Sequence, residues 1–333
     1  VSGPWDGFYT ALYQVNSLIV ALDKLAASQS RNEILGVASF FRGLIYYHLV
    51  SRYGEVPILE APFSGDIAAS TEEEGWSFVE KNFQVAIDYA PTFSDKYYVS
   101  KQAAKALMAR TKLAQGKLTE AAKLAEEVIG DANFSLADFD QIFRGKANRE
   151  EIFSFVNLLN ESSVNLSASL YSRASANGGS YTYAPTTKVM NMFEPDDKRT
   201  AISIDMQETN EVINKYPGGE VTTDPIIITR LGEMYLISAE AQGLSKGLSR
   251  LNELRNFRGL PSVHPATEED FIDAILNERH TELLAEGFRW FDLVRLNRLE
   301  SDLGFERKYN RLPIPAKERS LNKLLNQNSY WAN

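Results

Sequence analysis

The sequence predicts a predominantly α-helical protein, and three observations support this fold class. Apolar residues recur at helical spacing through most of residues 1–133 and 228–333. Two pairs of these helical stretches are rich in small residues and meet at a glycine, the layout of a tetratricopeptide-like hairpin. Residues 134–227 instead hold short apolar runs among many Ser, Asn and Gly residues, typical of loop with minor strand. We therefore expect one domain, 1–333, in which 134–227 is an insertion without an apolar core of its own.

The first two helices are expected at Trp5–Ala27 and Ile34–Tyr53. The first places apolar residues at helical spacing, with Trp5 turned toward the core. The second is mostly apolar and is followed by Gly54, a natural C-terminal stop, so it should be buried on most sides. His48 lies within it and is interpreted as a core histidine.

The stretch from Glu60 to Thr71 is rich in Ala, Pro, Ser and Gly, and its length is typical of a functional loop. Thr71 and Glu74 form the capping pair of a third helix, which runs to the neighbourhood of Pro91. Trp76 on this helix stands at i, i+3, i+4 spacing with other apolar residues, which favours packing over ligand binding.

Two helical hairpins are predicted from glycines that separate paired helices with small residues. The first pair is Ser100–Gln115 and Thr119–Ile129, with Gly116 between them, and the second is Ile228–Gln242 and Leu248–Arg258, with Gly243 between them. No strict 34-residue period can be counted, so the repeat rests on helix pairing and small residues alone.

A further helix begins at Thr267, which forms an approximate capping box with Asp270, and we expect it to end at Gly287. Glu278, Glu282 and Glu286 recur every four residues on it, so three like charges share one face and need cations. The nearest candidates are Arg279, Arg289 and Arg295, with Asp292 as a further carboxylate, in a network that locks this helix to a Phe288–Arg298 helix.

A metal site is the chemical alternative for these carboxylates. A di-metal bundle needs Glu-x-x-His twice, whereas His48, His264 and His280 do not stand three residues after a glutamate. The charges are therefore interpreted as structural, and we expect neither a metal nor a cofactor.

The chain carries an ordered set of motifs in its C-terminal half. These are Asn277-Glu278-Arg279, Glu282-Leu283, Glu286-Gly287-Phe288-Arg289, Asp292-Leu293, Arg295, Leu312-Pro313-Ile314-Pro315, Glu318 and Asn326-Gln327-Asn328. In order and spacing they resemble the signature of the SusD/RagB family, and Phe41-Arg42-Gly43 and Tyr53-Gly54-Glu55-Val56-Pro57 extend the likeness toward the N-terminus. The resemblance implies a SusD-like fold and a surface-exposed outer-membrane lipoprotein of Bacteroidetes. It also implies capture of a nutrient, usually a glycan, and its delivery to a SusC-type TonB-dependent transporter.

Composition and charge exclude several classes of protein. A net charge of −9 without a cluster of Lys and Arg argues against nucleic-acid binding. The absence of cysteine excludes disulfides and thiol chemistry. No apolar run approaches the roughly 18 residues that cross a bilayer. If the resemblance holds, the membrane is reached through a lipid anchor upstream of Val1.

Candidate ligand-binding residues lie in loops on the helical frame, where binding residues concentrate. Tyr171, Arg173, Tyr181 and Tyr183 stand in a Ser-, Asn- and Gly-rich stretch that we expect to be too polar to bury them. Phe63 and Asp66 lie in the earlier loop, and Tyr97 and Tyr98 lie in a turn between helices. Tyrosine offers a flat ring to the C–H face of a sugar and a hydroxyl to its oxygens, which suits glycans and also peptides.

No catalytic motif accompanies these residues: Gly-x-Ser-x-Gly, His-Glu-x-x-His, a P-loop and a dinucleotide fingerprint are all absent. The leading hypothesis is therefore a non-enzymatic, surface-exposed glycan-binding protein. The alternatives are a tetratricopeptide-type adaptor for protein partners, a SusD-like protein that binds peptides, and a hydrolase acting on the same nutrients.

Overall fold

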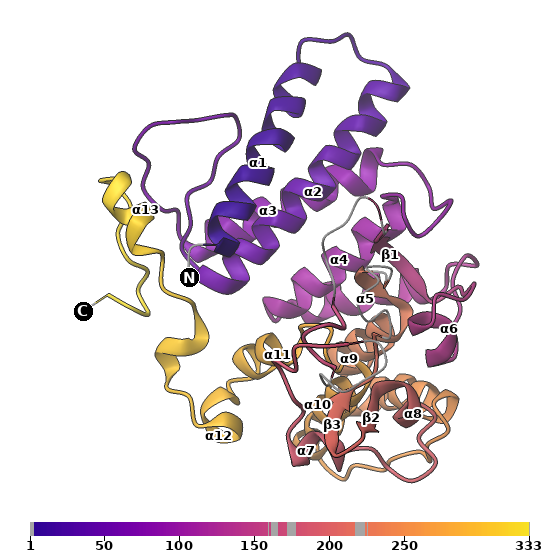
Figure 1. Ribbon diagram of the computed structural model, residues 1–333. Helices are drawn as coiled ribbons and strands as arrows, with labels where there is room; N and C mark the ends of the chain where they lie inside the picture. Colours follow the sequence, from indigo (N-terminus) through magenta and orange to yellow (C-terminus); the bar gives the residue numbers. More distant parts are fainter. Residues whose placement is uncertain are drawn as a thin grey trace. The chain divides into compact units, whose positions relative to one another are not determined.

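The computed structural model describes residues 3–158, 160, 166–171, 178–216, 224 and 226–332. Helices dominate these residues and strands are few and short, which confirms the predicted mainly α class (Figure 1). The chain divides into two compact units. The first unit is Val1–Ser94, Val99–Lys117 and Trp290–Asn333, and the second unit is Asp95–Tyr98 and Leu118–Arg289. This division does not follow the expected one into a helical scaffold and a 134–227 insertion.

The first unit is built on four long helices, α1 (Gly3–Leu22), α2 (Gln29–Tyr53), α3 (Glu72–Tyr89) and α4 (Lys101–Ala114). The central helix α2 contacts each of the other three. The capping box predicted from Thr71 and Glu74 is present at the start of α3. Trp5 and Trp76 are buried, as predicted, whereas Leu18 of α1 is exposed and does not belong to the core.

Helix α2 has the length and composition of a helix that could cross a membrane, which the sequence reading missed. In the structure, 72% of its most apolar window is buried inside the protein. Phe40, Leu49 and Val50 are fully enclosed by neighbouring side chains. Its apolar character is that of a core helix.

The C-terminal segment of the first unit returns to the end of α2 through backbone-directed contacts. Its short helices are α11 (Arg289–Arg295), α12 (Leu299–Leu303), η1 (Arg307–Asn310) and α13 (Ala316–Leu321). The buried Asn328 amide donates to the carbonyls of Tyr53 at 3.0 Å and Leu312 at 2.8 Å, and the Leu312 N–H donates to the Arg52 carbonyl at 2.6 Å. Two C-terminal motifs therefore serve to attach this segment to α2.

The second unit combines three helices with two small antiparallel sheets. The helices are α5 (Leu118–Ile129), α9 (Leu231–Phe257) and α10 (Glu268–Glu282), with short helices α6 (Phe139–Phe143), α7 (Thr187–Met190) and α8 (Thr200–Ser203). Strand β1 (Glu151–Phe155) pairs with β4 (Ile226–Arg230), and β2 (Ile204–Gln207) pairs with β3 (Asn210–Ile213). Helix α9 packs on both α5 and α10.

The second predicted hairpin is present as two halves of α9 that fold back on each other. Gly243 breaks the helix with φ +69°, a left-handed conformation that favours glycine. The Tyr235 hydroxyl donates to Glu253 at 3.0 Å across the hairpin. Gly247 lies so close to the opposite half that a Cβ there would stand 1.8 Å from the Ala239 carbonyl oxygen. The two helices of the first predicted hairpin, α4 and α5, fall in different units.

The segment 134–227 was expected to lack an apolar core, and this was wrong. It contains a small cluster of buried residues, Ala137, Phe139, Ile142, Phe143 and Tyr216, against which Leu166, Leu170, Ile202 and Ile227 pack. The aromatic residues are separated along the sequence by polar stretches, so no continuous apolar run reveals the cluster. Only the folding of α6 against the chain around Tyr216 brings them together.

A buried ion network joins the elements of the second unit around the carboxylates of α10. Its cations are Arg199, Lys215, Arg230, Arg255 and Arg258, and its carboxylates are Glu150, Asp197, Glu278, Glu282 and Glu286. Among the described residues these ten side chains are almost completely inaccessible, and the more exposed Glu194 also pairs with Arg255 at 2.9 Å. Such a set is tolerated in a core because each charge has an opposite partner and hydrogen bonds.

Glu282 is the centre of this network. Its carboxylate accepts from Arg230 at 2.6 Å, from Arg258 at 2.8 Å and from Arg199 at 2.8 Å. Burial raises the pKa of Glu282, but Arg258, Arg230 and Arg199 outweigh it and hold that pKa well below its usual range.

The structural interpretation of the three glutamates is correct, but the expected cations were wrong. Their partners come from α8, β4 and α9 and the segments beside them, not from the next helix. Arg289 donates to the Leu276 carbonyl, and Arg295 pairs with Asp292 inside α11. The three glutamates pair with cations distant in sequence, because folding brings those long side chains into one core.

Helix α10 ends at Glu282, five residues before the expected stop at Gly287. The capping box at Thr267 and Asp270 is present as predicted. At the other end, the Lys215 ammonium donates to the carbonyls of Glu282 at 2.9 Å and Leu284 at 3.0 Å. These buried hydrogen bonds satisfy carbonyls at the end of α10, which would otherwise need N–H groups from another helical turn.

Gly247→Ala should destabilise the protein by about 1 to 3 kcal/mol or more, because the new methyl group forces the halves of α9 apart. The measurement is urea unfolding followed by circular dichroism. Gly7→Ala is the control: Gly7 lies in α1 with open space around it, so the free energy of unfolding should rise by about 0.5 to 1 kcal/mol. Equal effects at the two positions would contradict the close approach.

Glu282→Gln should lower the free energy of unfolding by about 3 to 5 kcal/mol at pH 7, because it leaves buried arginines without their carboxylate. Glu60→Gln is the control, since the Lys81–Glu60 pair is exposed and should contribute less than about 1 kcal/mol. Because the folded pKa of Glu282 is depressed, its contribution is complete above about pH 4.5 and is lost at lower pH. The difference in free energy of unfolding between wild type and Glu282→Gln should therefore become smaller below that pH. A difference that stays constant with pH would contradict the assignment.

Candidate functional site

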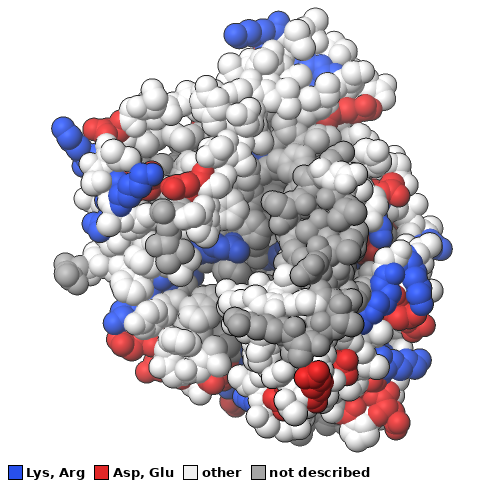
Figure 2. All heavy atoms as spheres, in the orientation of Figure 1, with Lys and Arg blue, Asp and Glu red and all other residues white. Residues whose placement is uncertain are grey.

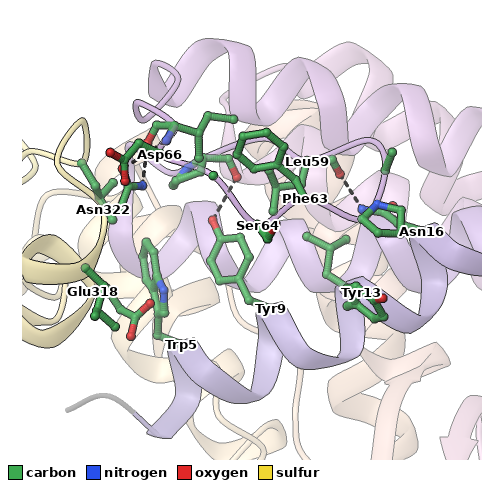
Figure 3. Close-up of a pocket in the computed structure, with 18 residues that line it drawn as sticks. Trp5, Tyr9, Tyr13, Asn16, Leu59, Phe63, Ser64, Asp66, Glu318 and Asn322 are labelled. Carbon is green, nitrogen blue, oxygen red and sulfur yellow. Dashed lines mark hydrogen bonds between the residues drawn. The ribbon is translucent and has the colours of Figure 1, made fainter.

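A cavity of about 570 Å³ in the first unit is the candidate binding site. Three parts of the chain line it: one face of α1, the loop from Pro57 to Ile67, and residues 318–325 at and after α13 (Figure 3). Phe63 and Asp66, both predicted as ligand residues, belong to this lining. A volume of this size falls within the range of small-molecule sites.

Helix α1 supplies an aromatic face to the cavity. Trp5, Tyr9 and Tyr13 follow one another at four-residue spacing, so they share one side of the helix, and Asn16 continues the row. Trp5 is buried against Tyr9, with ring centroids 5.0 Å apart, whereas Tyr13 is 54% exposed. The sequence predicted Trp5 as a core residue, and Tyr9 and Tyr13 were not predicted as binding residues. Their regular spacing with Trp5 was a signal that could have identified them.

The first end of the loop is fixed by hydroxyl and amide groups of α1 and α2. The Tyr9 hydroxyl donates to the Pro57 carbonyl at 2.9 Å, and the Asn16 amide donates to the Leu59 carbonyl at 2.7 Å. Tyr46 of α2 accepts from the Leu59 N–H at 2.6 Å. These bonds hold the backbone where the loop leaves the helical frame.

Beneath this end lies Arg42, a nearly buried cation of α2. Its guanidinium donates to the side-chain oxygens of Asn82 at 2.6 Å and Asn16 at 3.3 Å, and to the Glu60 carbonyl at 3.5 Å. Burial lowers the pKa of Arg42 from its usual value. The arginine fixes Asn16, which in turn fixes the loop.

The second end of the loop is fixed by the segment after α13. The side chain of Asn322 accepts from the Ile67 N–H at 3.0 Å and donates to the Ile67 carbonyl at 2.7 Å. Asp66 Oδ1 accepts from the Lys323 N–H at 3.2 Å. With both ends attached, the loop presents its tip, residues 61–65, over the cavity (Figure 3).

The tip carries Phe63, whose ring is 52% exposed. It rests on Gly65, where an added Cβ would lie 2.7 Å from the ring. Ser64 and Asp66 also line the cavity, and Asp66 lies beside Asn322 (Figure 3). The cavity therefore offers exposed aromatic surface from two elements, Phe63 of the loop and Tyr13 of α1, next to polar groups.

The remaining predicted residues lie in the second unit. Tyr97 and Tyr98 are 39% and 68% exposed, and the Lys96 carbonyl accepts from the Ser154 N–H at 2.9 Å, so the turn lies beside β1. The Lys96 ammonium stands 5.2 Å from the centre of the Tyr97 ring. The cavity of the first unit does not include them.

The tyrosine-rich stretch proves less uniform than predicted. Tyr171 is only 2% exposed, its hydroxyl donates to Asn214 at 3.1 Å, and burial raises its pKa to about 12, so the expectation that it is exposed was wrong. Polar neighbours did not prevent burial because the chain at Gly179 packs against the Tyr171 backbone. Tyr181 donates to the Glu211 carbonyl at 2.8 Å, Tyr183 is 65% exposed, and Arg173 lies outside the described residues.

Comparison with models of protein families shows which family the chain belongs to. Residues 110–310 match the model of the SusD family, and residues 2–113 match a model described as starch-binding associating with outer membrane. The chain belongs to the SusD family. This confirms the resemblance seen in its C-terminal motifs.

Individual relatives of the SusD family match nearly the whole chain. SusD-like protein P2 of Formosa agariphila is 25% identical over 99% of this chain and 80% of its own length, and SusD-like protein P38 of the same organism is 26% identical over 90% and 73%. Among solved structures, a laminarin binding SusD-like protein superposes with a TM-score of 0.85 at 24% identity, covering 99% of this chain and 86% of its own. Surface glycan-binding protein A from Bacteroides uniformis superposes with a TM-score of 0.83 at 20% identity, covering 99% and 85%. The chain shares its fold with these proteins.

Tyr171→Ala should destabilise the protein by about 3 to 5 kcal/mol, because it removes a large buried ring. Tyr183→Ala is the matched control from the same stretch, and its exposed ring should change the free energy of unfolding by less than about 0.5 kcal/mol. Chemical unfolding of both variants provides the measurement. Comparable losses at the two positions would contradict the different burial.

Proposed function

We propose that this SusD-family protein binds a glycan at the cell surface in the cavity of the first unit. It hands the glycan to a SusC-like TonB-dependent transporter of the outer membrane. A lipid anchor upstream of the present sequence holds it at that membrane. The protein acts by binding, without chemical change to the glycan.

The observation that carries this proposal is the exposed pair of rings, Phe63 and Tyr13, beside one cavity. An aromatic ring stacks on the apolar C–H face of a pyranose, and neighbouring oxygens satisfy the sugar hydroxyls. Ser64, Asp66 and Glu318 supply such oxygens in the lining. Rings held on a pinned loop and on a long helix need little reordering when a ligand binds.

The relatives support the same ligand class. The family model that covers the N-terminal third is described as starch-binding, and two structural relatives are named for laminarin binding and surface glycan binding. The described outer-membrane association of that model supports the location. The transporter and the lipid anchor follow from the family resemblance and complete the proposal.

Phe63→Ala and Tyr13→Ala should each weaken glycan binding by about 0.5 to 1.5 kcal/mol, the contribution of one aromatic contact beyond its buried area. Melting temperatures should hardly change, because both rings are already exposed. Calorimetric titration with the best ligand from a glycan array provides the affinities. Tyr89→Ala, an exposed tyrosine at the end of α3 outside the cavity lining, is the control and should bind as wild type does.

Three results would contradict this assignment. Unchanged affinity in both cavity variants, with loss in Tyr98→Ala or Tyr183→Ala instead, would move the site to the second unit. Release of reducing sugar from the bound glycan would replace the binding function with a hydrolase. Failure of any glycan to bind, with capture of a defined protein partner, would favour the adaptor.

A further inference from the structure

The lining of the cavity in the first unit carries unequal numbers of negative and positive side chains. Among the described residues, those that line it include two carboxylates, Asp66 and Glu318, and neither a lysine nor an arginine. Asp66 and Glu318 come from the two sides of the contact between the loop and the C-terminal segment (Figure 3). The lining therefore offers hydrogen-bond acceptors and negative charge.

Two ion pairs lie just outside the lining and add no net charge to it. Asp6 of α1 faces Lys317 of α13 at 4.0 Å, and Glu60 of the loop pairs with Lys81 of α3 at 3.2 Å, so each pair is neutral. Arg319 and Lys323 are exposed residues of the C-terminal segment that do not line the cavity.

Arg42 of α2 also lies near the loop, but it is not among the residues that line the cavity. It is only 7% exposed; its Nε donates to Asn82, and its Nη1 donates to Asn16 and to the Glu60 carbonyl. The described lining thus lacks the cationic fork by which proteins hold a carboxylate or sulfate.

Tyr9, another residue of the lining, lies within reach of the Glu318 charge. The pKa of Tyr9 is raised well above its ordinary value, mainly by burial, with smaller contributions from Tyr46, Tyr53 and the Glu318 carboxylate. On the face drawn in Figure 2, charges of both signs are interspersed over the described residues.

We infer that the cavity selects uncharged glycan chains and excludes glycans that carry uronic-acid or sulfate groups. This inference rests on the proposed function and names the ligand class of the same site. Asp66 and Glu318 accept hydrogen bonds from the hydroxyls of a neutral sugar, whereas an anionic group placed between them meets like charge without a compensating cation. Neutral chains lose nothing from this arrangement, because every sugar hydroxyl can donate.

The test compares one oligosaccharide in two charge states. A panel of neutral, uronic and sulfated hexasaccharides is first titrated calorimetrically, and the best neutral binder is then oxidised at C6 to its uronic derivative. The wild-type protein should bind the oxidised chain about tenfold or more weakly than the parent. A higher salt concentration should reduce this difference, because it screens the repulsion.

The double variant Asp66→Asn, Glu318→Gln keeps the shape of the lining and removes its charge. Its affinity for the oxidised chain should rise about fivefold or more, and its preference for the parent over the oxidised chain should fall accordingly. The amide oxygen introduced by Asp66→Asn can still accept from the Lys323 N–H, so the attachment of the loop is retained. The control is the double variant Glu73→Gln, Asp88→Asn, which changes two exposed acids of α3 outside the lining. It alters the net charge equally and should not raise the affinity for the oxidised chain.

The outcomes separate this inference from the proposed function. Tight binding of an acidic glycan that is lost in Phe63→Ala would overturn the charge selection and leave glycan binding at this cavity intact. Equal affinity for parent and oxidised chains, or no gain in the double variant, would also overturn the selection alone. If no glycan of either class binds, both proposals are wrong.

Discussion

Glu282 and the cations around it hold the second unit together, because a buried carboxylate tolerates burial only where opposite charges and hydrogen bonds surround it. Its oxygens accept hydrogen bonds from Arg199, from Arg230 at the end of β4 and from Arg258 at the end of α9. Three segments distant in sequence must therefore meet at one point. Removal from water costs each charge several kcal/mol, and partial assembly leaves that cost unmatched. The network therefore favours one arrangement of α8, β4, α9 and α10 over looser alternatives.

In the first unit, several polar contacts serve to hold the loop. Tyr9, Asn16 and Tyr46 bond the backbone at one end of the loop, and Asn322 bonds it at the other. Tyr9, Asn16 and Tyr46 belong to α1 and α2, which also bury residues in the core. A short tip with an exposed phenylalanine is thereby placed on a frame that does not need to move when a ligand arrives.

Under the proposed function, the aromatic rings would supply affinity and the acidic lining would supply selectivity. Stacking on Phe63 and Tyr13 is open to any pyranose with an apolar face, because a ring has little preference among sugars. Asp66 and Glu318 add discrimination by charge, which acts against the wrong ligand more than for the right one. The chain shares its helical fold with SusD-like proteins at low sequence identity, and a shared fold does not by itself fix the ligand.

The sequence alone determined the helical class, the capping boxes at Thr71 and Thr267, the family, and the structural role of Glu278, Glu282 and Glu286. Each of these follows from local spacing, which acts within a few residues and is visible in the chain. Phe63 and Asp66 were predicted from loop composition, which is also local, and both line the cavity. The tertiary structure decided which arginines meet the glutamates, the burial of Tyr171, the early end of α10 and the joining of α1, the loop and α13 around one cavity. Those features depend on contacts between residues tens to hundreds of positions apart, and no local pattern in the sequence records which distant side chains will share a site.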